Sequence, residues 1–306
     1  MIEINSIKIA ICITFHYNEH RLKYLEKVIN EFDNLGLNIN ITIITNTNDP
    51  LVLTKIKNFV FHNISNIYFF TPIGLGHPYL LAWSHLEIFR KQVLDESFTH
   101  FLYIEDDILI TKKNIDYWLI NREILRPYGL IPSFFRYEIN NFNKKFYSSD
   151  VVKPISIYDC KLFKISENKS FINIPYPYQG LYFLDRELLL EHLNGPSSCP
   201  DFDHNDSGLF RIQSHDMRAR AAFCLTFINI PKGYRSRNVL LLNGTNIDEA
   251  CLVHHLPNNY TNNPDLIGGK VLLKDIFQNK SISSFLSFHL KTLFKTIFKY
   301  YINKKI

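Results

Sequence analysis

The chain has 306 residues, of which 46% are hydrophobic and 21% are charged, and its formal net charge is +5. A chain of this length and composition is able to bury a large core, which excludes a largely disordered protein. The positive charge gathers near the C-terminus, and we expect no nucleic-acid partner. Five widely spaced cysteines without a CxxC pair argue against a disulfide framework and a zinc site, and they indicate a reducing cytoplasm.

The sequence contains no charge-free apolar run of the ~18 residues that a membrane-spanning helix needs, so we expect no integral membrane segment. The apolar stretch IKIAICITF at 7–15 follows the acidic Glu3, and it lacks a basic flank and a cleavage site of small residues. These features favour a buried first strand over a signal peptide.

Short apolar runs rich in Ile, Val, Phe and Tyr alternate with longer amphipathic stretches in the first part of the chain. Strands are predicted at 7–15, 39–45, 66–70 and 99–105, and helices at 22–35, 50–58 and 78–94. This alternation is typical of βαβ units, so we predict an α/β fold with a mainly parallel, Rossmann-like central sheet flanked by helices. Ligands of such sheets bind at the carboxyl ends of the strands.

The pattern becomes less regular after Leu130. A strand is predicted at 131–138, loops and short strands at 139–175, and helices at 185–193 and 214–227. The last of these begins with a Ser and an Asp, which suit a helix N-terminus. The predicted organisation is therefore a first half at 1–130, a second half at 131–265 and a C-terminal tail at 266–306.

The stretch FLYIEDDILIT at 101–111 places three consecutive carboxylates, Glu105, Asp106 and Asp107, at the end of a predicted buried strand. If the strand continues through Asp107, alternation directs Glu105 and Asp107 to one side and Asp106 to the other. Oxygen ligands at such a strand end suit Mg²⁺ or Mn²⁺ shared with the phosphates of a substrate. The alternative is a charged turn whose carboxylates cap backbone groups or pair with Lys112 and Lys113.

Together with the preceding GLGHPYLLAWSHLEIF, this segment resembles glycosyltransferases of the GT-A fold, of the kind that build bacterial lipopolysaccharide or capsule. The resemblance covers about residues 7–262. It implies that residues 1–130 bind a nucleotide sugar, a UDP-sugar in the first place, and that residues 131–265 bind the acceptor and carry the catalytic group. In that family a DxD-like motif holds a divalent ion on the donor diphosphate, which implies Asp107 as a metal ligand and Glu105 and Asp106 as donor contacts.

Two further segments extend the resemblance on the donor side. The opening strand IAICITFHYNE resembles the family's first nucleotide-binding strand, and GLGHP at 74–78 takes the place of its glycine-bearing loop. The donor contacts that this implies are His16, Tyr17, Asn18, Glu19, Gly74 and Gly76. CLVHHLPNNY at 251–260 resembles the segment whose histidine completes the metal site, which implies either His254 or His255 as a ligand of Mn²⁺ or Mg²⁺.

The second half resembles the acceptor side of the same family. YPYQGLYFLDRELLLEHL resembles a segment in which a glycine-bearing strand precedes a helix, which implies Tyr178 and Gln179 as acceptor contacts. Glu138 is a second carboxylate on the acceptor side and a candidate acid or base. SHDMRARAAF corresponds in order to the segment whose last carboxylate acts as base in inverting members, which implies Asp216 as the catalytic base. His215 stands where the family usually has Glu. An N-cap without a chemical role is the alternative for Asp216.

The C-terminal tail carries Lys291, Lys295 and Lys299 at four-residue spacing, with aromatic and aliphatic residues over much of the remaining surface. This pattern is typical of an amphipathic helix that lies in an anionic membrane interface. A terminal helix packed on the body with its lysines facing outward is the alternative.

The sequence thus predicts a metal-dependent glycosyltransferase of the hexosyltransferase type, peripheral at the cytoplasmic face of the cell membrane. It would move a sugar, with inversion, from a nucleotide-sugar donor to a surface glycan or lipid-linked acceptor. One alternative is a metal-dependent nucleotidyltransferase or phosphohydrolase that uses the same acidic strand end. Another is a non-catalytic peripheral membrane protein that binds glycans. The absence of GxSxG and of a P-loop motif argues against a serine hydrolase and a P-loop NTPase.

Overall fold

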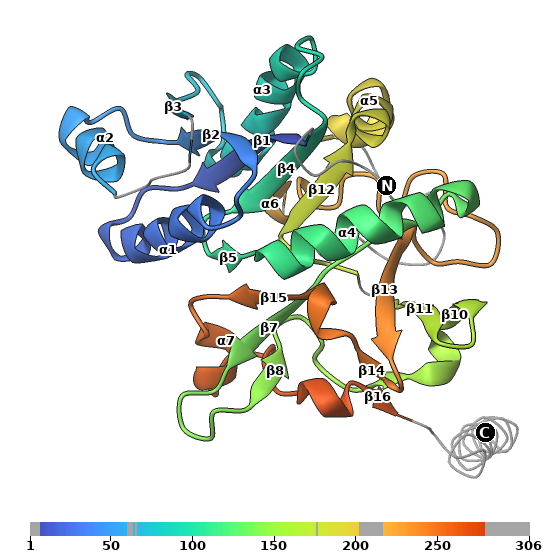
Figure 1. Cartoon of the computed structure of the whole chain (residues 1–306). Coiled ribbons are helices and arrows are strands. Elements are labelled where there is room, and N and C mark those ends of the chain that lie inside the picture. Colours follow the sequence, from blue (N-terminus) through green and yellow to red (C-terminus); the bar gives the residue numbers. More distant parts are fainter. Residues whose placement is uncertain (1–6, 60–63, 65, 176, 202–216, 279–306) are drawn as a thin grey trace, which may run out of the picture.

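The computed structural model describes residues 7–59, 64, 66–175, 177–201 and 217–278. Its central feature is a five-stranded sheet in the order β12-β4-β1-β2-β3 (Figure 1). Four strands are parallel, β1 Lys8–Phe15, β2 Asn38–Thr45, β3 Asn66–Phe70 and β4 His100–Glu105. The fifth strand, β12 Leu181–Asp185, pairs antiparallel with β4. The predicted α/β class with a mainly parallel, Rossmann-like central sheet is confirmed.

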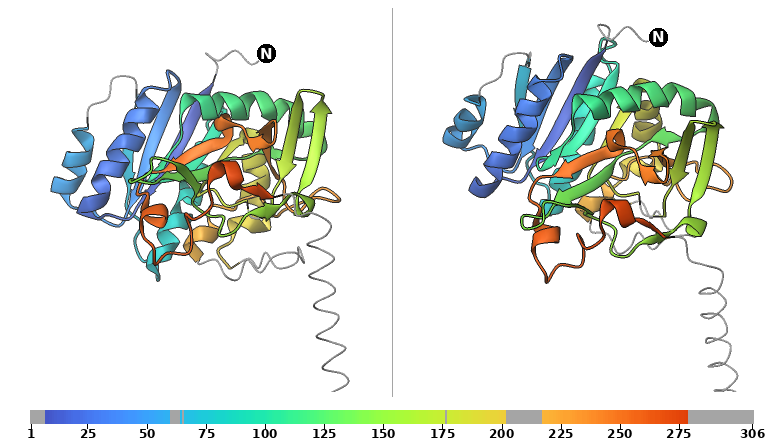
Figure 2. Two further views of the ribbon diagram at one scale, coloured as in Figure 1. Left: turned by 90° about the horizontal axis from the view of Figure 1, so that it is seen from below. Right: turned by 60° about the horizontal axis from the view of Figure 1, so that its bottom comes forward.

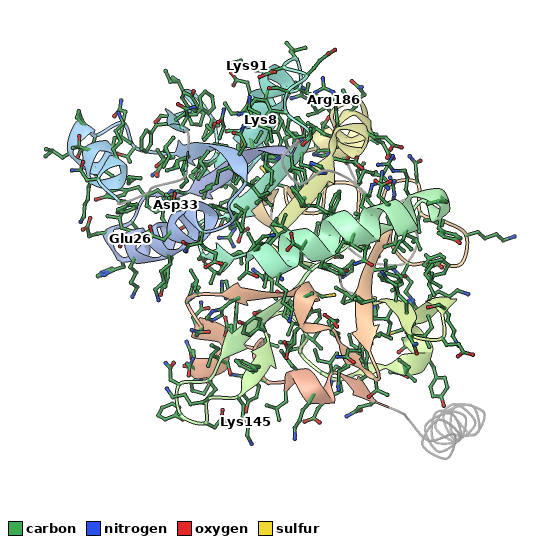
Figure 3. All side chains as sticks on the ribbon, in the orientation of Figure 1. Lys8, Glu26, Asp33, Lys91, Lys145 and Arg186 are labelled. Carbon is green, nitrogen blue, oxygen red and sulfur yellow. The ribbon has the colours of Figure 1, made fainter. Side chains whose placement is uncertain are left out.

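Helices follow the strands of this sheet along the chain. They are α1 Leu22–Asp33, α2 Pro50–Lys57, α3 His85–Gln92, α4 Lys112–Leu125 and α5 Arg186–Asn194. Nearly every residue of β1 and β4 is buried, so packed elements cover both faces of the sheet. Charged side chains such as Lys91, Arg186 and Lys145 lie at the periphery of the molecule (Figure 3).

The second half of the chain adds three smaller sheets. One has the order β5-β15-β7-β8, with β5 Ile108–Leu109, β15 Leu252–His255, β7 Phe135–Ile139 and β8 Phe146–Ser148. Another joins β10 Lys161–Ser166, β11 Lys169–Asn173, β13 Asn238–Asn243 and β14 Asn246–Ile247, with β6 Ile131–Pro132 beside β13. The third pairs β9 Ile155–Ser156 with β16 Phe277–Gln278. The β10–β11 hairpin lies at the opposite end of the molecule from α2 (Figure 2).

Short helices complete the described part of the chain. Two are single-turn α-helices, α6 Met217–Arg220 and α7 Asn259–Asn262. The 3-10 helices are Glu19–Arg21, Pro78–Ser84, Arg126–Tyr128, Ile157–Asp159, Pro196–Ser198, Glu249–Cys251 and Leu273–Asp275.

Most of the elements predicted for the first half are confirmed, with ends that shift by one or two residues. The predicted helix at 78–94 differs, because it starts as a 3-10 helix at Pro78 and becomes α-helical only at His85. The predicted helix at 214–227 also differs, because the described part is helical only from Met217 to Arg220. Cys224 has a φ of 46°, in the left-handed region, and this conformation cannot belong to a right-handed helix.

The predicted side-chain directions of the acidic cluster required the strand to continue through Asp107, and it does not. Strand β4 ends at Glu105, and Asp106 and Asp107 form a turn that leads into β5. The turn allows both aspartates to reach the same guanidinium group, that of Arg21, which strict alternation along a strand would prevent. The predicted assignment of Asp106 to the opposite side therefore fails as well.

A buried ion pair fixes β12 and α5 against α4. The Nε atom of Arg122 donates to Oδ2 of Asp185 at 2.6 Å, and both side chains are largely excluded from solvent. The other oxygen of Asp185 accepts from the backbone N–H of Leu188 at 2.8 Å, so the same carboxylate caps α5. Through this pair, a strand from the second half of the chain is held at the edge of the central sheet.

Two predictions concern residues outside the described part of the chain. Asp216 directly precedes the first described residue of α6, and the tail beyond Gln278 carries the three lysines of the predicted basic stripe. Within the residues that the structure does describe, no helix has the length and apolar character that crossing a membrane would take.

Candidate active site

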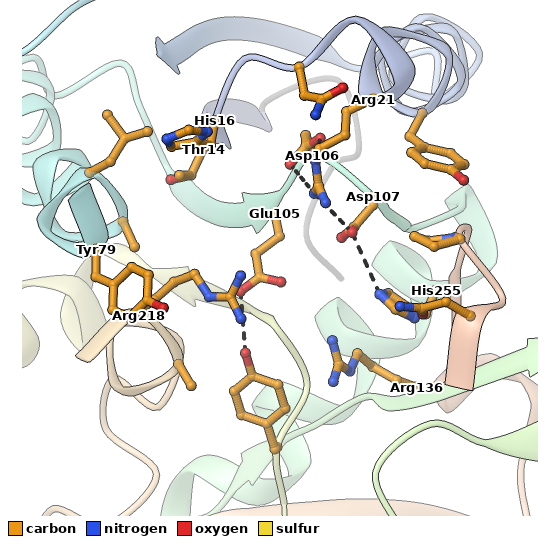
Figure 4. Close-up of a pocket in the computed structure, with 18 of the residues that line it drawn as sticks. Thr14, His16, Arg21, Tyr79, Glu105, Asp106, Asp107, Arg136, Arg218 and His255 are labelled. Atoms are coloured by element: carbon orange, nitrogen blue, oxygen red, sulfur yellow. Dashed lines mark hydrogen bonds and ion pairs between the residues drawn. The ribbon is translucent and has the colours of Figure 1, made fainter. Parts of the chain in front are cut away.

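A cavity of about 730 Å³ lies at the carboxyl ends of β1 and β4 (Figure 4). Its wall includes Thr14 from the end of β1 and Glu105 from the end of β4. Residues from the second half close the other side, among them Arg136, Tyr178 and His255. This is the edge at which ligands of parallel α/β sheets bind, and the cavity has the volume of a site for a small organic ligand.

Arg21 joins the two aspartates that follow β4. Its Nε and Nη2 atoms donate to the two oxygens of Asp106 at 2.9 and 2.6 Å, and Nη2 also donates to Oδ2 of Asp107 at 2.9 Å. Arg21 stands at the end of a short 3-10 helix that starts directly after Asn18, whose side chain accepts from the backbone N–H of His20. The charged turn is thus paired with an arginine from the first βα connection, and neither Lys112 nor Lys113 pairs with it.

His255 approaches the same turn from the second half of the chain. Strand β15 pairs antiparallel with β5, and this register places His255 opposite Ile108, one residue after Asp107. The Nε2 atom of His255 lies 3.6 Å from Oδ2 of Asp107. On the other side of the ring, Nδ1 lies 2.6 Å from Oε1 of Glu138. Glu138, His255 and Asp107 therefore lie in a row that leads from the protein interior to the cavity.

His254 faces away from this row. Its ring stacks on Tyr137 with centroids 4.9 Å apart, and its Nε2 atom lies 2.9 Å from Oδ1 of Asn258. Neighbouring residues of a strand point to opposite faces, so only one of the two histidines is able to reach the cavity. The structure places His255 there.

Burial and neighbouring charges shift the pKa values of Asp106, Asp107 and His255. Burial opposes ionisation of Asp107, but the hydrogen bond and charge of His255, followed by Arg21, hold its pKa below the usual value. Burial and the neighbouring charge of Asp107 raise the pKa of Asp106 to about 7, against the effect of Arg21. Although burial lowers the pKa of His255, its bonds to Asp107 and Glu138 raise that pKa to about 9. Without a bound cation, His255 therefore carries the positive charge that balances Asp107.

Glu105 and two arginines form a second polar group on the cavity wall. The hydroxyl of Tyr178 donates to Oε1 of Glu105 at 3.2 Å, and Arg136 lies over the Tyr178 ring at 4.6 Å. Arg136 is paired with Asp150, and Arg218 lies beside Glu105 in Figure 4. Burial, followed by the charge of Asp107, raises the pKa of Glu105.

Gly180 makes the close approach of Glu105 and Arg136 possible. Its φ is +66°, and a Cβ atom built there would lie 3.2 Å from Nη1 of Arg136 and 3.4 Å from Oε2 of Glu105. A side chain at this position would be strained and would crowd both groups. The glycine-bearing strand noted in the sequence thus has a physical role at the cavity wall.

The predicted donor-side residues divide into two groups. His16 and Asn18 line the cavity, whereas the hydroxyl of Tyr17 donates to Glu19, and Glu19 pairs with Lys55 on the exposed surface. The glycine-bearing loop lies beside the main cavity: Gly76 borders a smaller pocket that shares His16, Pro78 and Leu81 with it, and Gly74 lines a separate open groove.

The predicted acceptor-side residues are also divided. Tyr178 lines the cavity. Gln179 faces away from it, because its Oε1 atom accepts from Ser133 Oγ at 3.1 Å and from the backbone N–H of Phe134 at 2.8 Å. Glu138 is fully buried behind His255 and is not part of the cavity wall.

Sequence reasoning missed several residues of the cavity wall. Arg21 is the most important, since it binds both aspartates, and the others include Tyr79, Tyr103, Asp150 and Tyr260. A signal for Arg21 was present, because it follows the capping residue Asn18 at the start of the first βα connection, near the carboxyl end of β1. Tyr260 lies five residues beyond His255, and only the fold shows that its ring stacks on the imidazole, with centroids 5.4 Å apart.

The donor set of the cavity fits a divalent ion shared with a ligand. Within the described part of the chain, no group of three or more His, Cys, Asp or Glu side chains forms a complete metal site. The two groups that meet, Asp107 and His255, are nevertheless suitable ligands of Mn²⁺ or Mg²⁺, with substrate phosphates supplying further oxygens. The Oδ1 atom of Asp107 is buried and has no hydrogen-bond partner among the described residues, which leaves an acceptor for a cation.

The fold and the cavity define a Rossmann-like α/β protein with a polar, partly charged site at the carboxyl edge of its sheet. No protein-family model matches the chain. No curated protein matches it in sequence either. Among solved structures it is similar to 4-diphosphocytidyl-2C-methyl-D-erythritol synthase from Anaerococcus prevotii, with 14% sequence identity and a TM-score of 0.33 over 70% of this chain and 86% of the other. A similarity of this size does not assign an activity.

Proposed function

We propose that this protein is a glycosyltransferase that moves a sugar from a nucleotide-sugar donor, a UDP-sugar in the first place, to a glycan or lipid-linked acceptor. The observation that carries the proposal is the meeting of Asp107 and His255, which are far apart in the sequence, in the cavity at the carboxyl ends of β1 and β4. Arginine side chains line the same cavity and have the paired donors that suit a diphosphate. The order of motifs that resembles GT-A enzymes supports the same assignment.

Each group of the cavity has a defined task in this proposal. When bound, Mn²⁺ or Mg²⁺ held by Asp107 and His255 would neutralise negative charge on the departing nucleoside diphosphate. Asp106 holds the guanidinium of Arg21 at the cavity wall, where it is able to bind a phosphate oxygen. The rings of Tyr79 and Tyr178 offer apolar faces against which a sugar is able to pack.

We infer that Asp216 is the base of an inverting transfer. It directly precedes α6 in the sequence, and α6 contributes Arg218 and Ala219 to the cavity wall. The carboxylate would accept the proton of the acceptor hydroxyl while that oxygen forms a bond to the anomeric carbon. The bond from this carbon to the donor diphosphate breaks on the opposite face, and its electron pair leaves with the diphosphate.

A turnover assay with a panel of nucleotide sugars tests the proposal. We expect release of nucleoside diphosphate and a lengthened glycan with at least one donor, and we expect this release to require Mn²⁺ or Mg²⁺. Consumption of a nucleoside triphosphate with release of pyrophosphate would instead identify a nucleotidyltransferase. Binding of a glycan without turnover of any nucleotide would support a non-catalytic protein and contradict the proposal.

We further propose that the C-terminal tail binds the inner face of the cell membrane, where a lipid-linked acceptor is available. The support is the lysine spacing in the sequence, since a basic stripe opposite an apolar surface favours an anionic lipid interface. Removal of residues 279–306 is expected to abolish co-flotation with vesicles that contain phosphatidylglycerol and to leave turnover of a soluble acceptor intact. Co-flotation that persists after this truncation would refute the role of the tail.

A further inference from the structure

We propose that Glu138 is a positioning residue that fixes the tautomer of His255, so that the Nε2 atom faces Asp107 as a cation ligand. The proposal rests on the proposed function, because it concerns the same site. Glu138 does not line the cavity and would not touch the substrate or a bound ion. It would act entirely through the imidazole.

The hydrogen bonds of Glu138 indicate which nitrogen of the His255 ring carries a proton when the ring is neutral. Glu138 is fully buried. Its Oε2 atom accepts from the backbone N–H of Thr261 at 2.7 Å, and its Oε1 atom lies 2.6 Å from Nδ1 of His255. A carboxylate in this position is able only to accept, so Nδ1 of the ring must donate its hydrogen. The remaining nitrogen, Nε2, is directed at Asp107 and the cavity.

Glu138 also connects His255 to another part of the cavity wall. Thr261 belongs to the short helix α7, which carries Tyr260, and the Tyr260 ring stacks on the His255 ring. The carboxylate of Glu138 therefore binds both the His255 ring, at Nδ1, and the backbone of helix α7, whose Tyr260 stacks on the face of that ring. Metal-binding histidines usually donate their second N–H to such a partner, which fixes the ring orientation.

The neighbouring His254 gives a comparison within the same strand. Its partner is the neutral side chain of Asn258, and its ring packs on Tyr137 rather than on the cavity wall. Two adjacent histidines thus have different environments. Only His255 combines a buried carboxylate on one nitrogen with an aspartate facing the other.

Glu138→Gln tests the proposal with almost no change of shape. The N–H of Thr261 requires an acceptor, so the amide oxygen is expected to face it and the NH₂ group to face His255. Nδ1 then becomes an acceptor, and the proton moves to Nε2, where it blocks binding of a cation. We expect the Mn²⁺ affinity, measured by electron paramagnetic resonance or calorimetry, to fall about 10- to 100-fold.

The tautomer itself is measurable without any metal. In ¹⁵N-labelled protein at a pH above about 9, where the His255 ring is neutral, its resonances are expected to show a proton only on Nδ1 in the wild type and only on Nε2 in Glu138→Gln. A variant that keeps the Nδ1 proton and binds Mn²⁺ as tightly as the wild type would overturn the proposal. If the wild type binds no Mn²⁺, the metal role in the proposed function fails, and the ¹⁵N measurement still decides whether Glu138 sets the tautomer.

Two further variants separate positioning from a general loss of stability. Glu138→Asp keeps a carboxylate, and we expect it to retain the Nδ1 proton and to bind Mn²⁺ more tightly than Glu138→Gln. If Glu138→Gln does not fold, loss of the Nδ1 proton in folded Glu138→Asp would contradict the proposal. Asp185→Asn is the matched control, because Asp185 is a buried, ion-paired carboxylate outside the cavity. This control is expected to lower the free energy of unfolding without changing the Mn²⁺ affinity. An equal loss of affinity in Asp185→Asn would contradict a specific role of Glu138.

Discussion

Asp107→Asn is expected to abolish Mn²⁺ binding in the cavity and to lower kcat/KM for sugar transfer by about 10³-fold, which corresponds to ~4 kcal/mol of transition-state stabilisation. The substitution preserves the shape of the side chain but removes the charge that faces His255. It also replaces one of the acceptors at the cavity wall by an amide nitrogen, which cannot bind a cation. Mn²⁺ titration and steady-state kinetics on the folded variant measure both effects.

Asp106→Asn provides the matched comparison for this prediction. Asp106 is the adjacent residue, is equally buried and also binds Arg21, but no contact joins it to His255. We expect its replacement to weaken binding of the nucleoside diphosphate through Arg21 and to leave the Mn²⁺ affinity of the free protein nearly unchanged. If the two variants lost Mn²⁺ affinity equally, the assignment of Asp107 as the particular ligand would be wrong.

The central sheet was predictable because its signals are local. Apolar runs of strand length alternate with amphipathic stretches from Lys8 to Glu105, and each run folds as a strand at nearly the predicted position. The antiparallel pairing of β12 with β4 was beyond this reasoning. The place of β12 beside β4 depends on contacts such as the Arg122–Asp185 pair, which joins residues from two distant segments.

The candidate site was only partly predictable for a similar reason. The acidic cluster and the pair of histidines are visible in the sequence, but their relation depends on the pairing of β15 with β5, which brings His255 to Asp107. The end of β4 at Glu105 agrees with the predicted strand at 99–105, but strand alternation does not indicate how side chains point in the turn that follows, where Asp106 and Asp107 lie. The partner that this turn requires, Arg21, comes from a different βα connection.

Asp216→Asn is expected to lower kcat about 10²- to 10⁴-fold, the range that a positioned general base supplies, while the KM for the donor stays within a factor of a few. The reason is that Asp216 would act on the acceptor hydroxyl alone, whereas Asp107 and Arg21, which line the cavity, would bind the cation and the donor. Mn²⁺ affinity should therefore equal that of the wild type, in contrast to Asp107→Asn.

A different result is expected for Asp216→Asn if Asp216 only caps the helix and has no chemical role. Asparagine is as good an N-cap as aspartate. If Asp216 only caps α6, the Asp216→Asn variant would therefore keep both its free energy of unfolding and its kcat. Asp216→Ala would then lower the free energy of unfolding by ~1 kcal/mol and leave the kcat of the folded enzyme unchanged. Measured together, kcat and the free energy of unfolding of these two variants separate a base from a cap. Near-normal kcat in both would exclude Asp216 as the base and favour transfer with retention or a different acceptor of the proton.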